Sequence, residues 1–211
     1  EGVSQVKPLL NEMENAKSLA DLRALQLKYA SFGYGVPMGY SFEADEKNAK
    51  MNILLIYQDG LSLGQKEYYL DNDKATADIR NAFRQFIANM FRLYGFSDTQ
   101  AAAKRDAVMR YETMLALISK SRTELRDVEA NYNKMTLGEF KENIPLEQLA
   151  NAEGIKSEYI QTMVVCQPAF LAGVDKLTAT ESAEELRARM EWSAILASAN
   201  YLSDDIRAEY F

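Results

Sequence analysis

Helical spacing of apolar residues is the strongest constraint on how this chain of 211 residues can fold. From residue 71 onward, apolar side chains recur at intervals of three and four residues, which places them on one face of an α-helix. Three pairs form capping boxes, in which a Ser or Thr that begins a helix precedes a Glu or Gln by three residues: Ser97 with Gln100, Thr136 with Glu139, and Ser182 with Glu185. We therefore expect everything after residue 71 to be helical.

The helices of this part can be placed one by one. Asn72 or Asp73 begins the first, and Gly95 ends it in the left-handed conformation that glycine adopts after a helix. Its apolar face carries Ile79, Phe83, Phe86, Ile87, Met90 and Tyr94. The next helix begins at Ser97 and is predicted to be long, with Val108, Tyr111, Leu115, Ile118, Leu125 and Tyr132 on its apolar stripe. Thr136 begins another helix, and Pro145 a short one. The last begins at Ser182, with Leu186, Met190, Ile195 and Leu196 facing inward.

The first 70 residues have a different pattern. Ser18 is placed to begin a helix, and the glycine-rich segment 33–39 ends it. Two apolar segments, 40–43 and 52–57, flank a polar turn at 45–48 and predict a β-hairpin over about 40–57. Because no repeat or linker divides the chain, we expect a single domain over residues 1–211. The predicted fold is mainly α, a multi-helix lobe with one small β-hairpin.

Composition limits the chemistry that this chain can perform. It has 24 Lys and Arg against 31 Asp and Glu, a net charge of −7, which argues against non-specific binding to nucleic acid. It has no histidine, which removes Ser-His and Cys-His nucleophile pairs and the usual zinc sites. No apolar run approaches the length of a membrane-spanning helix, so we expect no membrane segment in this chain.

Individual candidate sites are weak. Gly33, Gly35 and Gly39 match no phosphate-binding motif and have no neighbouring lysine, so a turn is the better interpretation. Glu67 and Asp71 match the spacing E-x-x-x-D of some zinc proteases, but a ligand Glu needs His partners, and we interpret the match as coincidence. Cys166, the single cysteine, is expected to be a small buried apolar residue.

The charged residues of the predicted long helix favour a solvated face. Its cations Lys104, Arg105, Arg110 and Arg122 are interleaved with the acids Asp106, Glu112 and Glu124. This mixture predicts ion pairs between residues four apart along the helix, rather than a basic groove. Other acids, such as the pairs at 184–185 and 204–205, are expected at helix starts or on exposed faces. We therefore predict no catalytic, cofactor-binding or metal-binding residue in this chain.

Two segments are particular enough to suggest a family. The first contains Gln58-Asp59-Gly60-Leu61-Ser62-Leu63 followed by Tyr68-Tyr69-Leu70, and the second contains Arg126-Asp127 followed by Tyr132-Asn133-Lys134-Met135-Thr136-Leu137. Together they resemble the neprilysin-like zinc metalloendopeptidases, peptidase family M13, which includes endothelin-converting enzymes and bacterial oligopeptidases. The part from Val164 through Trp192 to Phe211 resembles the family's next stretch, so the likeness covers essentially the whole chain.

The resemblance implies a role as well as a fold. The family holds zinc with His-Glu-x-x-His and a downstream Glu, none of which occurs here. They would belong to a catalytic lobe beyond Phe211, and the family's first segment would precede Glu1. The chain then resembles an internal fragment, the non-catalytic helical cover of a zinc metalloendopeptidase that hydrolyses peptides, enclosing the active-site chamber and limiting substrate size.

The same resemblance names the partners and leaves alternatives open. It implies the catalytic lobe of the same polypeptide as the partner, zinc only in that lobe, and an extracytoplasmic location. The animal members of the family are rich in disulfides, so a chain with one cysteine is more similar to the bacterial members. The alternative is a freestanding helical binding or scaffold domain with no enzymatic role. A self-contained hydrolase is disfavoured by the missing histidines.

Overall fold

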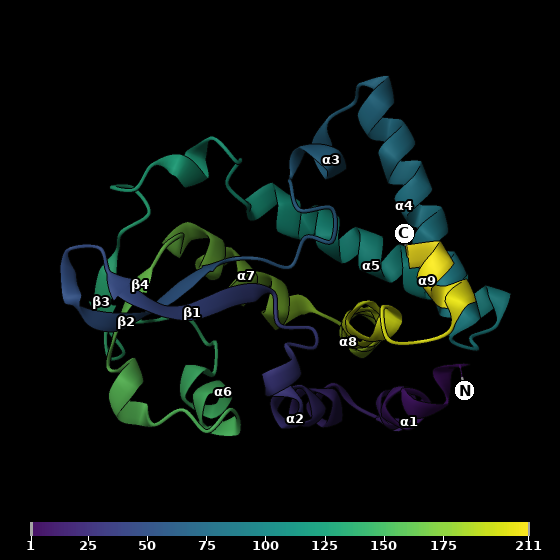
Figure 1. Cartoon of the computed structure of the whole chain (residues 1–211), viewed down its shortest axis with the longest axis horizontal. Coiled ribbons are helices and arrows are strands. Elements are labelled where there is room, and N and C mark those ends of the chain that lie inside the picture. Colours follow the sequence, from purple (N-terminus) through teal and green to yellow (C-terminus); the bar gives the residue numbers. More distant parts are fainter. Residues whose placement is uncertain (1, 211) are drawn as a thin grey trace.

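The computed structural model describes residues 2–210, and in it helices surround one small sheet (Figure 1). The α-helices are α1 (Lys7–Asn15), α2 (Leu19–Lys28), α3 (Glu67–Leu70), α4 (Lys74–Leu93), α5 (Asp98–Ile118), α6 (Leu146–Ala152), α7 (Pro168–Thr180), α8 (Ala183–Ala199) and α9 (Asp204–Tyr210). The strands are β1 (Met38–Asp45), β2 (Asn48–Gln58), β3 (Lys134–Thr136) and β4 (Thr162–Val165). Short 3₁₀ segments are η1 (Gly2–Gln5), η2 (Ala30–Phe32), η3 (Glu124–Arg126) and η4 (Ser157–Ile160). The prediction of a mainly α fold is confirmed.

The sheet has the strand order β1-β2-β4-β3. β1 and β2 pair antiparallel from Met38 opposite Gln58 onward, which confirms the predicted hairpin. β4 adds to β2 in parallel, with Leu54 opposite Met163, and β3 pairs antiparallel with β4. The expectation that everything after residue 71 is helical is therefore wrong at β3 and β4. β4 is four residues long, too short to show a period, and its partner β2 lies about 110 residues earlier in the chain.

Most predicted helix starts are confirmed. Ser18, Ser97 and Ser182 each accept a hydrogen bond from the backbone N–H three residues later, and the carboxylate of Asp73 accepts one from Thr76. Gly95 follows α4 with a φ of 96°, the left-handed conformation expected of it. These starts were predictable because a cap and its helix are adjacent in the sequence.

The long helix is shorter than predicted. α5 ends at Ile118, and residues 119–133 form turns around η3. The side chain of Gln58 forms hydrogen bonds with both backbone groups of Lys120. It accepts from the N–H at 2.8 Å and donates to the carbonyl at 2.9 Å. This tertiary contact replaces the hydrogen bonds that would continue the helix, and it leaves Leu125 exposed instead of buried.

Thr136 begins no helix, which corrects a third prediction. It is the last residue of β3, and residues 137–139 form a turn. The carboxylate of Glu139 accepts from the N–H of Thr136 at 2.8 Å and from its hydroxyl at 2.9 Å. The side-chain pattern of a capping box is thus present, but it closes a turn after a strand. The short helix predicted at Pro145 is confirmed as α6.

Buried apolar residues gather in two clusters. The helical core joins α1, α2, α4, α5, α8 and α9 and includes Met13, Leu22, Ile87, Phe91 and Trp192. The sheet core joins the sheet, α6 and α7 and includes Ile56, Met163, Phe170 and Leu171. α5 runs through both, contributing Val108 to the first and Leu115 to the second.

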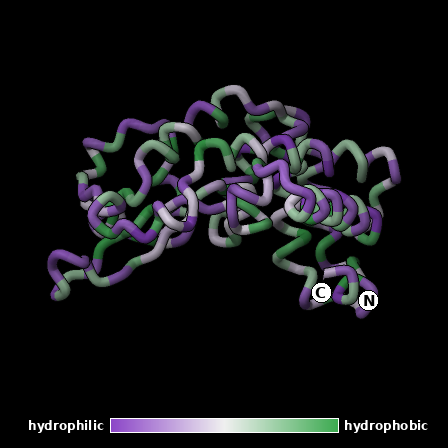
Figure 2. The backbone as a smooth tube through the Cα atoms, turned by 90° about the horizontal axis from the view of Figure 1, so that it is seen from above, coloured by the Kyte–Doolittle hydropathy of each residue, from purple (hydrophilic) through white to green (hydrophobic). Residues whose placement is uncertain are grey.

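The molecule is arched along its longest axis. In Figure 2 the tip of the β1–β2 hairpin lies at one end and the chain termini, next to α1 and α9, lie near the other end, and both project to the same side. The middle of the arch is formed by α2, α5, α7 and α8. Within residues 2–210, no helix combines the length and the apolar character needed to cross a membrane.

Candidate functional site

A cavity of about 300 Å³ lies at the middle of the arch, where the segments 33–37 and 59–62 meet α5 and α8. We call it the central cavity. Its lining includes Gly33, Gly35, Gly60, Ser62, Tyr111, Glu112, Arg189 and Trp192. It therefore brings together residues of the first recognised segment and buried charges from two helices.

Glu112 is buried on α5, because its spacing from Val108 and Leu115 places it on the apolar stripe of the helix. Its carboxylate accepts from the backbone N–H of Ser62 at 3.1 Å, from the hydroxyl of Ser62 at 2.6 Å, and from the hydroxyl of Tyr69. Burial raises the pKa of Glu112 to about 7, although these hydrogen bonds act to lower it. Burial therefore favours the protonated form of this carboxyl.

The first recognised segment is held against α5 and α8 by these bonds. The indole N–H of Trp192 donates to the hydroxyl of Ser62 at 3.0 Å, and the hydroxyl of Tyr69 accepts from the N–H of Leu63 at 3.0 Å. At the far end of α5, the ammonium of Lys66 donates to the carbonyl of Ser119 at 2.7 Å. These residues position the loop, and all of their contacts here are within the chain.

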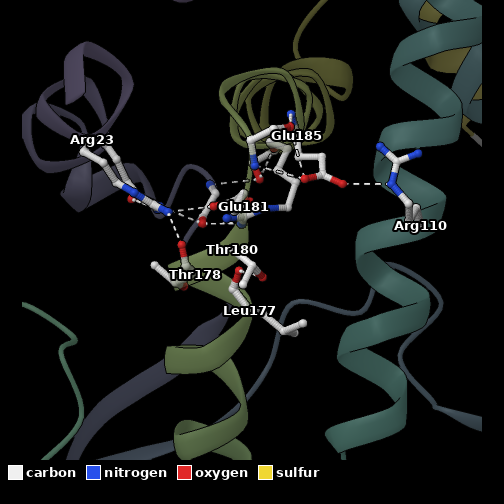
Figure 3. Close-up of polar contacts among 12 residues, drawn as sticks. Arg23, Arg110, Leu177, Thr178, Thr180, Glu181 and Glu185 are labelled. Atoms are coloured by element: carbon white, nitrogen blue, oxygen red, sulfur yellow. Dashed lines mark hydrogen bonds and ion pairs between the residues drawn. The ribbon is translucent and has the colours of Figure 1, made fainter. Parts of the chain in front are cut away.

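Arg189 forms the second buried charge of the central cavity. Its Nε donates to Glu181 at 2.6 Å, its Nη1 donates to the carbonyl of Gly35 at 2.5 Å, and its guanidinium stacks 3.9 Å from the ring centre of Tyr111. Figure 3 shows that Glu181 also accepts from Arg23 of α2, at 2.8 Å. One buried carboxylate thus links α2 and α8 next to the end of α7.

Other charged residues of α5 pair with different helices. Lys104 donates to Glu14 of α1 at 2.7 Å and to Glu191 of α8 at 2.6 Å, and Arg110 pairs with Glu185 of α8 at 2.8 Å (Figure 3). The expected pairing along one helix face is wrong for these residues. Glu191 is fully buried, and burial raises its pKa to about 8 against the effect of Lys104.

The second recognised segment is tied to the hairpin. Asp45, at the end of β1, accepts from the hydroxyl of Tyr132 at 2.7 Å and pairs with Lys134 of β3 at 2.6 Å. The hydrogen bond from Lys134, followed by those from Tyr132 and the N–H of Lys47, lowers the pKa of Asp45 to about 2. This segment therefore fixes the edge of the sheet to the hairpin.

The candidates singled out in the sequence lie apart from one another. Gly33 and Gly35 have φ values of 68° and 69°, and a Cβ on Gly35 would lie 2.8 Å from Met190. Gly39 lies in β1, where a Cβ would overlap the ring of Tyr57. Cys166 is only half-buried, which corrects the expectation of a buried residue.

The acids of the E-x-x-x-D match stand at the two ends of the single-turn helix α3, at Glu67 and Asp71. Among residues 2–210, no group of three Cys, Asp or Glu side chains is placed to hold a metal ion, and the chain has no histidine. The residues present do not fit a zinc site. The central cavity is instead lined by buried charged residues that hydrogen bonds hold in place at the middle of the arch.

The whole chain, residues 1–211, matches the family model for the N-terminal region of peptidases described as "Peptidase family M13". The chain belongs to peptidase family M13. The relatives of this M13 chain include endothelin-converting enzyme-like 1 of Mus musculus, 27% identical over 172 residues, covering 77% of this chain and 22% of the relative. The neutral endopeptidase of Lactobacillus helveticus is 27% identical over 180 residues, which cover 84% of this chain and 27% of that relative.

A solved structure has the same fold as this M13 chain. The zinc metalloprotease Zmp1 of Mycobacterium tuberculosis, in its open state, superposes with a TM-score of 0.88 at 25% identity, covering 99% of this chain and 32% of Zmp1. The chain thus spans about a quarter of the length of the curated relatives and a third of the solved one. It corresponds to the N-terminal domain of M13 zinc metalloendopeptidases.

Sequence reasoning missed the buried charges of this M13 domain. Glu112 and Glu191 are buried, although the acids are expected at helix starts or on exposed faces. Arg189, for which the sequence makes no prediction, is buried as well. A signal was available for two of them. Glu112 lies four residues after Val108, and Glu191 lies four before Ile195, so both occupy positions of an apolar stripe. A charged residue at such a position is expected to be buried, with hydrogen-bond partners supplied by another segment of the chain.

Proposed function

We propose that this chain is the non-catalytic cover lobe of a zinc metalloendopeptidase that hydrolyses peptides. The observation that carries the proposal is the match of the full chain to the N-terminal region of M13 peptidases, together with the arched shape of Figure 2. The concave side of the arch faces the active-site chamber of a catalytic lobe in the same polypeptide, and that lobe holds the zinc.

The lobe limits substrate size and supplies no reacting group. Its buried carboxylates, Glu112 and Glu181, accept hydrogen bonds from other segments of the chain, which supports a role in positioning those segments. A cover of this kind acts by excluding long or folded chains and by shielding the reaction from bulk water.

The test uses the full-length parent enzyme with a bulky residue at the mouth of the central cavity. Asp59→Trp is placed in that mouth, and Lys74→Trp, on the exposed start of α4, is the matched control. We expect Asp59→Trp to lower kcat/KM for long peptides about tenfold, which corresponds to about 1.4 kcal/mol, while a short reporter peptide keeps its kcat. An equal loss for both lengths with an intact fold would contradict the size-limiting role.

A further inference from the structure

One dipeptide of this chain places an aspartate directly before a main-chain nitrogen that no side chain covers. Of the ten glycines, only Gly60 follows an Asp or Asn, namely Asp59. Both residues are exposed, and both lie outside the helices and strands, in the segment between β2 and α3. Because glycine has no Cβ, the nitrogen that follows the Asp59 carboxyl is open to it. The dipeptide is therefore the place in the sequence where a side-chain carboxyl and the next amide react most easily.

The structure holds these two groups together. The N–H of Gly60 donates to Oδ1 of Asp59 at 2.7 Å, so the carboxyl is folded back over the nitrogen, and its carbon Cγ lies one bond beyond the contact. Among residues 2–210, this N–H donates to no main-chain carbonyl. A contact that is already formed in the ground state is the kind from which an intramolecular reaction proceeds fastest.

The surroundings of Gly60 keep the dipeptide in this conformation. Its φ is 99°, which glycine adopts freely, and a Cβ at this position would lie 3.1 Å from Leu115 and 3.2 Å from Cα of Pro37. The backbone is thus packed against α5 on one side, while the carboxyl of Asp59 lies on the exposed side. The reacting groups are held in place and remain accessible to water.

We propose that Asp59 rearranges spontaneously to isoaspartate and that the rearrangement releases the segment 59–62 from Glu112. The nitrogen of Gly60 attacks Cγ of Asp59 and loses its proton, the carboxyl loses a hydroxyl, and a succinimide ring forms with release of water. Water then opens the ring: addition at Cγ restores aspartate, and addition at the main-chain carbonyl gives isoaspartate. The water that was lost is regained, and nothing is oxidised or reduced. The proposal does not depend on the cover function.

Isoaspartate adds one CH₂ to the main chain between two anchored residues. On one side, the side chain of Gln58 holds both backbone groups of Lys120. On the other, Ser62 donates to Glu112 from its N–H at 3.1 Å and from its hydroxyl at 2.6 Å. The longer chain cannot move toward α5, which already packs against the dipeptide. The segment therefore moves outward, breaks its bonds to Glu112, and changes the mouth of the central cavity.

The first experiment follows the reaction in the folded full-length protein, kept in heavy-oxygen water at neutral pH. Each opening of the succinimide leaves heavy oxygen at residue 59, and electron-transfer dissociation in the mass spectrometer identifies isoaspartate. We expect the peptide with Asp59 to take up heavy oxygen about tenfold faster than the peptide with Asp127, because its attacking nitrogen is uncovered and close. Asp127 is the internal control: it is exposed outside helices and strands, but Val128 follows it, and its carboxylate accepts from the N–H of Ala130 at 3.1 Å.

A free peptide of residues 55–64 separates the effect of the fold from that of the dipeptide. We expect the folded protein to react at least as fast as this peptide, because the contact is preformed. Asp59→Glu keeps the charge but requires a larger ring, and it should stop the uptake at residue 59, whereas the matched variant Asp127→Glu should leave that uptake unchanged. A slower reaction in the folded protein than in the peptide, or equal rates at residues 59 and 127, would overturn the proposal.

Hydrogen exchange tests the release of the segment. The amide of Ser62 should exchange about tenfold faster in protein that carries isoaspartate than in fresh protein, because its bond to Glu112 is lost. The amide of Cys166, which donates to the carbonyl of Ile56 at 2.8 Å, is the internal control and should not change. Asp59→Glu aged in the same way should exchange like fresh protein. Unchanged exchange at Ser62 in protein with a measured isoaspartate content would overturn the release.

Discussion

The helical core and the sheet core of this lobe are assembled in different ways. In the helical core, α2, α4, α5 and α8 each begin at a residue whose side chain caps the helix, such as Ser97 or Ser182, and each contributes an apolar face. In the sheet core, β2 and β4 pair across about 110 residues, and neither strand forms the sheet without the other. The comparison shows that local signals determine one half of the lobe, whereas long-range pairing determines the other.

Buried charge is also distributed unequally between the two regions. Glu112, Glu181, Arg189 and Glu191 all lie on or next to α5 and α8, where helices pack against one another. In the sheet region, the buried charge is Asp45, which is paired at the edge of the hairpin. The two regions should therefore respond differently to loss of a charge and to pH.

The largest expected effect is loss of the carboxylate that links α2 to α8. Glu181→Ala leaves Arg189 buried without its carboxylate partner, and we expect the free energy of unfolding to fall by about 3–5 kcal/mol. Urea unfolding followed by circular dichroism measures it. Glu184→Ala, in the exposed first turn of α8, is the control and should change stability by less than about 0.5 kcal/mol. Similar small losses in both variants would contradict a structural role for the buried pair.

A second pair of variants tests whether the two cores unfold together. Ile87→Ala in the helical core and Ile56→Ala in the sheet core each remove a fully buried side chain, and each should cost about 2–5 kcal/mol. Because α5 contributes to both cores, we expect one cooperative transition in each variant. If Ile56→Ala instead gives two transitions by calorimetry, the cores are separate folding units and the prediction of a single domain is wrong.

The pH dependence should differ in sign between the two regions. A carboxyl whose pKa is raised in the folded state stabilises that state most below its ordinary value of 4.5. Stability therefore falls as the pH rises from 4.5 to about 7 for Glu112 and from 4.5 to about 8 for Glu191, and levels off above. Asp45 has a lowered pKa, so its contribution is present above 3.8 and is lost as the pH falls to about 2.

Charge-removing variants check these two slopes. Melting temperatures are measured from pH 2 to 9. Between pH 5 and 8 they should fall less steeply in Glu112→Gln and Glu191→Gln than in the unaltered chain, because neither amide titrates. Asp45→Asn should change the profile below pH 4 and leave the slope between pH 5 and 8 as it is. An unchanged slope between pH 5 and 8 in both glutamine variants would show that these buried carboxyls do not control it.

The smallest effects distinguish a capping box that begins a helix from one that closes a turn. Ser97→Ala removes the acceptor for the N–H of Gln100 at the start of α5 and should cost about 1 kcal/mol. Thr136→Ala removes only the exposed hydrogen bond to Glu139 after β3, and we expect about 0.5 kcal/mol. Denaturant melts of the two variants side by side measure the difference. A larger loss for Thr136→Ala would show that its hydroxyl stabilises more than this turn.

The sequence predicts the parts of this fold whose causes are local. Ser18, Asp73, Ser97 and Ser182 begin helices where expected, and the polar turn after Asp45 forms the hairpin, because each signal acts within a few residues. The end of α5 was not predictable, since Gln58 determines it from 62 residues away. The strand β4 was missed for the same reason.

The residues around the central cavity show a similar division. The segment from Gln58 to Leu70 was recognised from its sequence, yet its hydrogen bonds to Glu112 and Trp192 follow from the packing of α5 and α8. Arg189 and Glu181 lie eight residues apart and meet only because α8 begins just after α7 ends. The segment is therefore visible in the sequence, whereas its partners depend on how distant helices pack.

The parallel pairing of β2 with β4 also affects how the lobe is made in the cell. β2 leaves the ribosome about 110 residues before β4, which at 5–20 residues per second is a delay of roughly 5–20 s. During that time Leu54 and Ile56, which are buried in the finished sheet, have no β4 to pair with or pack against. The hairpin is thus an apolar segment that waits for its partner during synthesis, and we expect it to be the part of the nascent lobe that chaperones bind and that aggregates first when translation stalls before residue 162.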